Sequence, residues 1–111
     1  MSYIPNRGDV VWLNFTPQAG HEEMGTRSAL VLSPEKYNKK TGLAVCCQIT
    51  SNVKGYPFEV NISGKKINGV VLSDHLKNLD WKVRKAKFIE KASKEVIDEC
   101  SMKISALIIQ V

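Results

Sequence analysis

The chain has 111 residues, of which 43% are apolar and 24% are charged, and its formal net charge is +5. This length fits one domain with one hydrophobic core, and the ordinary composition excludes wholesale disorder. The longest apolar run, Leu43 to Cys47, is far shorter than the roughly 20 residues that a membrane span needs.

The chain begins with a strand and a long loop. Residues 9–15 predict a strand in which Val11, Leu13 and Phe15 share one face. Residues 16–27 are polar and contain one proline and two glycines, which predicts a loop between strands. Loops of this length are uncommon in compact domains and are often functional.

The next segments predict two strands around a short helix. Residues 29–32 are wholly apolar, as in a strand that is covered on both sides. Pro34 can occupy the first turn of a helix that ends at Thr41–Gly42. Residues 43–49 then alternate as a third strand, with Leu43, Val45, Cys47 and Ile49 on one face.

The second half predicts further strands and then a helix. Residues 58–62 have a clean period of two, and Asn68–Gly69 predicts a turn before a strand at 70–72. Residues 81–89 predict another strand, with a bulge near 85–88. Ser93 can cap a final helix whose apolar stripe, with spacings of three and four, must lie on the sheet or against a second subunit: Val96, Ile97, Cys100, Ile104, Leu107 and Ile108. We therefore predict a mainly β, barrel-like antiparallel domain of five or six strands with a terminal helix.

Charge and cysteine usage indicate the partner and the compartment. Residues 77–94 contain seven basic side chains and two acidic ones, which concentrates positive charge and points to a polyanion or an acidic protein. The odd cysteine count without a C-x-x-C pair supports neither a disulfide framework nor a zinc site. Residues 1–10 lack the apolar stretch of a signal peptide, so we expect one cytoplasmic domain over residues 1–111, without membrane contact.

Polar residues at strand ends are the candidates for chemistry. The sequence contains no metal-ligand motif, G-x-S-x-G elbow, phosphate loop or dinucleotide fingerprint, which excludes most large enzyme classes. Arg27 leads into the strand at 29–32, and Thr50 and Ser51 close the strand at 43–49. A guanidinium beside hydroxyls at a barrel rim suits an anionic phosphodiester.

Each of these features also has a purely structural explanation. Arg27 can simply pair with Glu22 or Glu23 at the surface. His21 and His75 can supply an acid and a base for RNA cleavage, or can be ordinary surface histidines. Trp12 and Trp81 suit the core or an interface as well as a base-stacking platform, and the lysines of residues 82–87 suit a solvated face as well as phosphate contacts.

Taken together, several segments resemble the MazF/PemK family of toxins. They are Gly8 to Phe15, Gly20 to Arg27, Ala29 to Ser33, Tyr37 to Gly42, Lys54 to Val60 and Gly69 to Asp74. The likeness is collinear over nearly the whole chain, and Lys54 to Val60 is its most specific part.

The resemblance implies an SH3-like (PemK-type) barrel with short helices and a C-terminal helix, working as a homodimer. It implies a metal-independent, sequence-specific endoribonuclease that cleaves single-stranded mRNA and needs no cofactor. A cognate antitoxin would inhibit it by laying an acidic segment along the RNA groove.

Site residues follow from the same resemblance. Arg27 and Thr50 match the family's catalytic positions, and Glu22 matches an acidic residue whose role varies within the family. Trp12 and Lys77 fall at binding positions. With the residues that charge and position in the chain suggest, the full RNA-binding set that we predict is Trp12, His21, Ser51, Lys54, Lys77, Lys82 and Arg84, with no metal ligand.

Two departures from the family and one rival function accompany this interpretation. The family usually has Pro after the catalytic Arg and often His before it, whereas this chain has Ser28 and Thr26. Loss of Pro frees the backbone at that corner, which we interpret as tuning of Arg27 rather than inactivation. The rival is a non-catalytic barrel toxin that acts by protein binding, as gyrase inhibitors do.

Overall fold

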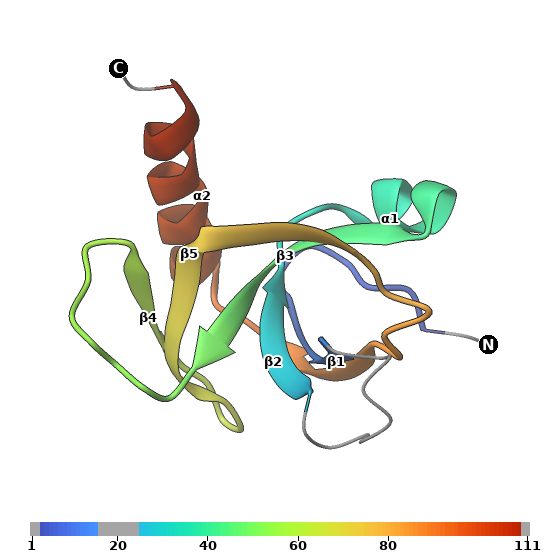
Figure 1. Ribbon diagram of the computed structural model, residues 1–111, viewed down its shortest axis with the longest axis horizontal. Coiled ribbons are helices and arrows are strands. Elements are labelled where there is room, and N and C mark those ends of the chain that lie inside the picture. The colour runs from blue at the N-terminus through green and yellow to red at the C-terminus, as the bar shows by residue number, and fades with distance from the viewer. Residues whose placement is uncertain (1–2, 16–24, 110–111) are drawn as a thin grey trace.

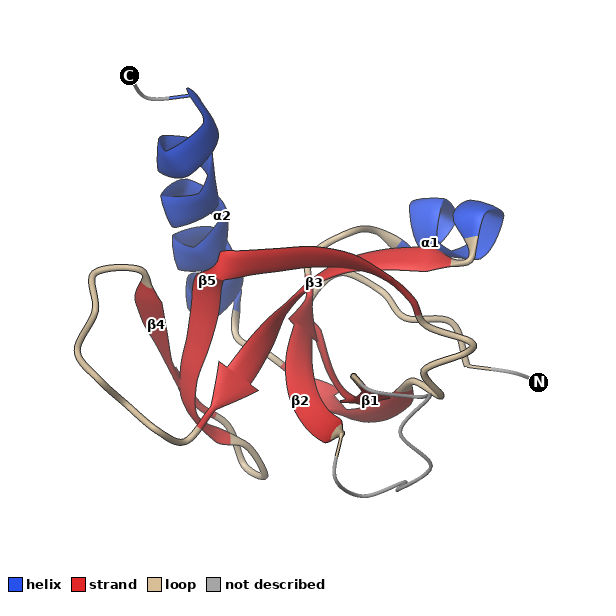
Figure 2. Ribbon diagram, in the orientation of Figure 1, coloured by secondary structure: helices blue, strands red, loops and turns tan. Residues whose placement is uncertain are grey.

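The computed structural model describes residues 3–15 and 25–109, which form six strands and two helices (Figures 1 and 2). The elements in chain order are β1 (Asp9–Asn14), β2 (Thr26–Val31), α1 (Glu35–Thr41), β3 (Leu43–Thr50), β4 (Glu59–Ser63), β5 (Asn68–Asp80), β6 (Lys87–Lys91) and α2 (Lys94–Ile109). The strands pair antiparallel in the order β4-β5-β3-β2-β1-β6. The sheet curls into a half-barrel with β4 and β6 as its edges, which confirms the mainly β prediction.

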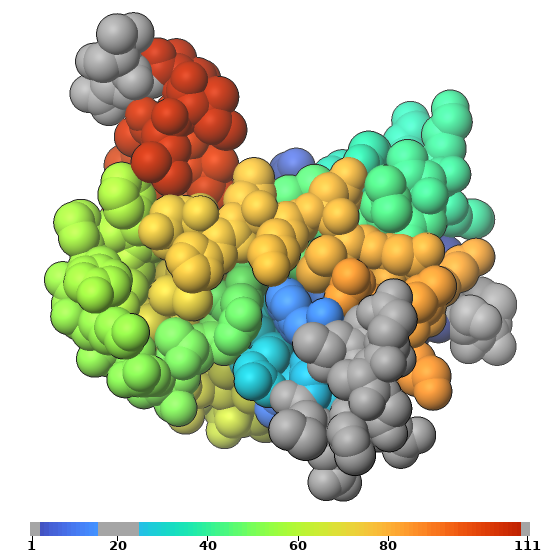
Figure 3. Space-filling model, in the orientation of Figure 1, coloured from blue at the N-terminus to red at the C-terminus, as the bar shows by residue number. Residues whose placement is uncertain are grey.

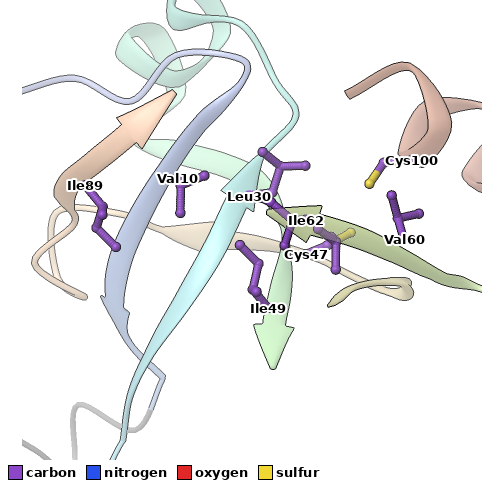
Figure 4. Packing of buried hydrophobic residues seen from close by; sticks show 9 residues of the cluster. Val10, Leu30, Cys47, Ile49, Val60, Ile62, Ile89 and Cys100 are labelled. Atoms are coloured by element: carbon purple, nitrogen blue, oxygen red, sulfur yellow. The ribbon is translucent and has the colours of Figure 1, made fainter. Parts of the chain in front are cut away.

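The alternating strand patterns produce two hydrophobic clusters. Figure 4 shows the first, in which Val10, Leu30 and Cys47 pack with residues of β4 and β6 and with Cys100 of α2. The second cluster contains Val11, Leu13 and Ala29, with Phe15 packed against it, which confirms the face predicted for β1. β1, β2 and β3 therefore contribute alternate side chains to the two clusters, and β2, with both faces covered, is apolar throughout residues 29–31.

α1 begins one residue later than predicted. Pro34 is its N-cap, with an extended backbone, rather than a residue of its first turn. The carbonyl oxygen of Pro34 accepts the first helical hydrogen bond from the N–H of Asn38. Gly42 ends the helix at φ +74°, a left-handed conformation that glycine adopts without a Cβ penalty, as predicted.

Two predicted boundaries in the second half are wrong. Asn68 and Gly69 do not form a turn, because they already pair with Ser63 and Ile62 in the β4–β5 ladder. The turn is Gly64–Ile67, and β5 runs from Asn68 to Asp80 instead of covering only 70–72.

Residues 81–89 do not form one strand. Residues 81–85 turn, with Lys85 at φ +54°, and β6 begins only at Lys87. A bulge does occur, but just beyond the predicted residues 85–88, since Val10 pairs with Glu90 and Val11 pairs with Phe88, leaving Ile89 as the extra residue.

α2 packs on the sheet through part of its apolar stripe. The Val96 N–H donates to Ser93 Oγ at 3.3 Å, which confirms the predicted cap. Val96, Cys100 and Ile104 contact the first cluster. The end of the helix projects from the body (Figure 3), with Ile108 72% and Ile109 75% exposed. Neither described helix is long and apolar enough to cross a membrane.

Candidate nucleic-acid interface

Three strand ends meet at one end of the sheet. Because β3 is antiparallel to both β2 and β5, the end of β3 lies beside the starts of the other two strands (Figure 1). A cleft of about 380 Å³ opens there, which we call the central cleft. Arg27, Thr50 and Ser51 line it together with Lys66 of the β4–β5 turn. The structure thus brings together the guanidinium and the hydroxyls that the sequence places at separate strand ends.

Arg27 is placed by strand pairing. It is the second residue of β2, where it pairs with Leu13 of β1, and its Nη1 donates to the carbonyl oxygen of Thr26 at 2.9 Å. Ser28 continues the strand opposite Trp12 and is 8% exposed. The backbone at this corner is therefore held in a paired strand although the proline usual in the family is absent.

Thr50 is placed by a close approach between backbones. It pairs with Val70 of β5, and its Oγ1 accepts a hydrogen bond from the Asn52 N–H at 3.1 Å. A Cβ atom built on Gly69 would lie 2.2 Å from the Thr50 carbonyl oxygen. Gly69 has φ +147°, so the absence of a side chain there lets β5 approach the end of β3.

Two further clefts adjoin the central one. A cleft of about 600 Å³ beside β6 shares Trp12 with the central cleft. A cleft of about 240 Å³ beside the loop between β3 and β4 shares Gln48 and Thr50 with it. We call these the β6-side cleft and the loop-side cleft, and the three together the groove. Trp12 is 40% exposed where two of the clefts meet, so an aromatic face is available along the groove.

The charges of the groove differ from one end to the other. Arg84, Lys85 and Lys87 line the β6-side cleft. The loop-side cleft mixes Lys54 and His75 with carboxylates of Glu59 and Asp74. The central and β6-side clefts therefore suit a polyanion better than the loop side does.

The predicted binding residues divide between the groove and other places. Trp12, Ser51, Lys54 and Arg84 line the groove. Arg84 Nη1 also donates to the carbonyl oxygens of Asn14 and Phe15 at 3.1 and 2.9 Å, so this guanidinium supports the backbone at the end of β1.

Two predicted lysines contact aromatic rings instead. Lys77 Nζ lies 6.0 Å from the centre of the Phe15 ring, and Lys82 Nζ lies 5.5 Å from that of Trp81. Neither lysine lines the three clefts. Glu22 and His21 lie outside the described residues, while the other predicted histidine, His75, is in the loop-side cleft.

Sequence reasoning missed several residues of the groove, namely Gln48, Lys66 and Asn68, whereas Lys85 and Lys87 belong to the basic run for which phosphate contact was one of two interpretations. The Gly64 to Ile67 segment carried a usable signal, because a glycine followed by two lysines between alternating strands is typical of a turn. Among residues 3–15 and 25–109, no three His, Cys, Asp or Glu side chains form a group that could hold a metal ion.

Comparisons with known proteins converge on one family. The sequence model of PemK-like, MazF-like toxins of type II toxin–antitoxin systems matches residues 6–108. The endoribonuclease toxin MazF of Escherichia coli is 42% identical over 106 residues, covering 96% of each chain.

Solved structures agree with the sequence comparison. A MazE–MazF crystal structure from Deinococcus radiodurans superposes with a TM-score of 0.87 at 43% identity, covering 99% of this chain and all of that one. A crystal structure of MazF from the same organism gives 0.86 at 50% identity, covering 96% of this chain and 97% of that one.

Proposed function

Since the chain belongs to the PemK-like, MazF-like family of type II toxins, we propose that it cleaves single-stranded mRNA in the groove, at the Arg27–Thr50 pair. It is an endoribonuclease toxin of a toxin–antitoxin system, as its relatives over nearly the whole chain are. The observation that carries the proposal for the site is the convergence of Arg27, Thr50 and Ser51 in one cleft. A purely protein-binding toxin would not need the Arg27–Thr50 pair in this cleft.

The proposed reaction is an internal transesterification. The ribose 2′-oxygen attacks the adjacent phosphorus and loses its proton to a base, and the bond from phosphorus to the 5′-oxygen breaks as that oxygen takes up a proton. The products are a 2′,3′-cyclic phosphate and a 5′-hydroxyl. One phosphorus–oxygen bond forms as another breaks, and one proton is removed as another is supplied, so the step needs no further reactant.

Arg27 and Thr50 act on the charge that develops at phosphorus. The Arg27 guanidinium offers a planar fork of donors to the non-bridging oxygens of the phosphorane. The Thr50 hydroxyl holds one of these oxygens, and Ser51 supplies a further hydroxyl to the bound RNA. Glu22 is the candidate base and His21 the alternative. We expect metal-independent cleavage, because stabilisation by these donors replaces a Lewis acid.

The partners follow from the family and from the charge of the groove. An antitoxin is the protein partner, and its acidic segment would occupy the groove because positive charge there attracts carboxylates as it does phosphates. We also propose a homodimer. A second copy of the chain would cover the exposed apolar side chains of α2, which are Met102, Leu107, Ile108 and Ile109.

The test is cleavage of a long RNA by the wild type and by Arg27→Ala, with mapping of sites and end groups. We expect Arg27→Ala to lose about 10²–10³-fold in kcat while remaining folded, since one preorganised donor typically contributes this much. Lys36→Ala, an exposed lysine of α1, serves as a matched control and should be unaffected. Near-normal activity of Arg27→Ala would remove this residue from the mechanism.

Two substrate and buffer conditions test the chemistry separately from the site. Cleavage should persist in EDTA, and RNA with a 2′-deoxy sugar at the scissile position should resist cleavage because it lacks the attacking group. Activity that returns only with added magnesium would contradict the proposed chemistry.

A further inference from the structure

The β4–β5 turn carries a lysine into the central cleft. The turn is Gly64–Ile67, closed by a hydrogen bond from the Gly64 N–H to the Ile67 carbonyl oxygen at 2.8 Å. Lys66 and Ile67 line the central cleft beside Arg27, whereas Lys65 lies on the same turn but does not line it. The position of this turn therefore determines where the backbone of Lys66 lies relative to the central cleft.

A single carboxylate holds the turn. Glu90 Oε1 accepts the Lys65 N–H at 3.0 Å, and its Oε2 accepts the N–H groups of Lys66 and Ile67 at 3.1 and 2.9 Å. Three consecutive backbone donors thus converge on one side chain from β6. Hydrogen bonds to an ionised acceptor are among the stronger ones in proteins.

The surroundings are adapted to this carboxylate. A Cβ atom on Gly64 would lie 2.3 Å from Glu90 Oε2, so only glycine leaves room for it. Burial raises the pKa of Glu90, but the backbone N–H groups of Ile67, Lys66 and Lys65, with the charge of Lys66, outweigh it and leave the pKa below its ordinary value. The ionised form that the turn requires is the favoured one.

The contact also joins the two edges of the open sheet. β4 and β6 are its outermost strands, and the turn after β4 is tied to β6 through Glu90 rather than through a ladder. Without Glu90 these three N–H groups would turn to water, and the turn would lose its hydrogen-bonded link to β6, keeping only the packing of Ile67 against the first cluster. The anchor of Lys66 would then no longer be fixed relative to Arg27.

Lys66 has the chemistry of a phosphate contact. In the described part of the chain, its Nζ forms no ion pair, since the four salt bridges there involve His75, Lys91, Lys94 and Lys103. Arg27 and Lys66 place two cations in one cleft of about 380 Å³, an arrangement that a polyanion stabilises. The lysine ammonium is a compact positive charge with hydrogen-bond donors, which suits a phosphate oxygen more than a base edge.

We propose that Lys66 binds a backbone phosphate of the RNA next to the one at Arg27, and that Glu90 is the positioning residue that fixes the turn carrying Lys66. This inference rests on the proposed function of the groove. It adds a binding residue and a positioning residue that lie outside the set expected from the sequence.

The test of Lys66 is binding and cleavage by Lys66→Ala, Lys66→Arg and Lys65→Ala, with Lys65 as the matched control on the same turn. Binding uses the RNA segment that the wild type cleaves, synthesised with a 2′-deoxy sugar at the scissile position. We expect Lys66→Ala to raise Kd and KM about tenfold, with kcat within about twofold, because one charge-assisted contact is lost. The slope of log Kd against log salt should fall by about 0.7 for one phosphate contact on a single strand. Lys66→Arg and Lys65→Ala should each stay within about twofold of the wild type.

The test of Glu90 is Glu90→Gln in the wild type and in the Lys66→Ala background, at a temperature at which circular dichroism shows every variant folded. The amide NH2 group opposes the backbone donors, so KM should rise while kcat changes little. In the Lys66→Ala background the same change should have almost no further effect, because the two residues act through one contact.

Each failure has a distinct meaning. If the wild type cleaves RNA and Lys66→Ala keeps the wild-type Kd and salt slope, Lys66 is no phosphate contact and the proposed function stands. If Glu90→Gln raises KM equally in both backgrounds, Glu90 does not act through Lys66. If the wild type neither binds nor cleaves RNA, the inference and the proposed function fall together.

Discussion

The closest approach in the site, between Gly69 and Thr50, gives a sharp prediction for Gly69→Ala. The new Cβ would lie 2.2 Å from the Thr50 carbonyl oxygen and 2.9 Å from its carbon, distances that real Cβ atoms essentially never show. The end of β3 must therefore retreat by about 1 Å, since close-packed backbone cannot absorb the overlap. The displaced segment contains Thr50, so the substitution moves a proposed catalytic hydroxyl without removing any polar group.

The expected effect follows from the size of this shift. A misplacement of about 1 Å costs on the order of 10²-fold in rate, so kcat/KM for RNA cleavage should fall about 100-fold, or about 2.7 kcal/mol of transition-state stabilisation. Overpacking should also lower the free energy of unfolding by about 1–3 kcal/mol. The assay is steady-state cleavage of a short fluorescent RNA, with urea unfolding measured on the same preparations.

Gly42→Ala is the matched control for this experiment. Gly42 also has a positive φ, +74°, but nothing lies within 4 Å of a Cβ atom there, and it caps α1 away from the groove. It should lose stability through backbone strain and keep its activity. Gly69→Ala with cleavage within threefold of the wild type would refute the argument, as would an equal loss of activity in Gly42→Ala.

Three further predictions concern parts of the molecule outside the catalytic pair. Asn38→Ala should lower the free energy of unfolding by about 3 kcal/mol, read from urea melts, because the fully buried amide bonds Ser33 and the Pro5 carbonyl oxygen; unchanged stability would contradict this. Lys103→Met removes the hydrogen bonds from Lys103 Nζ to the carbonyl oxygens of Pro57 and Glu59, so amide hydrogen exchange in the loop at residues 52–58 should become faster. Exchange at the wild-type rate would show that this contact does not hold the loop. Burial raises the pKa of the thiols of Cys46, Cys47 and Cys100 to about 12, so a thiol reagent should label the native protein slowly, and rapid labelling would contradict their burial. The free energy of unfolding should also fall as the pH rises above about 9, because there the thiols ionise in the unfolded chain but not in the folded one.

Period and turn chemistry predicted most of the fold because they act locally. The alternation in β1 and the glycine at Gly42 each specify the conformation of their own neighbours, and both predictions held. The prediction of a turn at Asn68–Gly69 was wrong because this pair, although typical of turns, lies in the β4–β5 ladder here. Gly69 is required by the carbonyl of Thr50, which is 19 positions earlier in the chain, and no local pattern contains that contact.

The candidate site was predictable at Arg27 and Thr50, but only in part along the basic segment that follows β5, where Arg84 lines the groove and Lys82 does not. A run of cations becomes one charged surface only if its backbone keeps one direction, as it does along a single strand. Here the chain turns at 81–85, where Lys85 has a positive φ, and the run is divided. Lys82 lies over the Trp81 ring, whereas Lys87, five residues later, lines the β6-side cleft. Lys66 reaches the central cleft from a different hairpin, because a carboxylate 24 positions further along the chain accepts its backbone N–H. Net charge therefore indicated the class of partner, while the particular cations that meet it depend on turns and on contacts between distant segments.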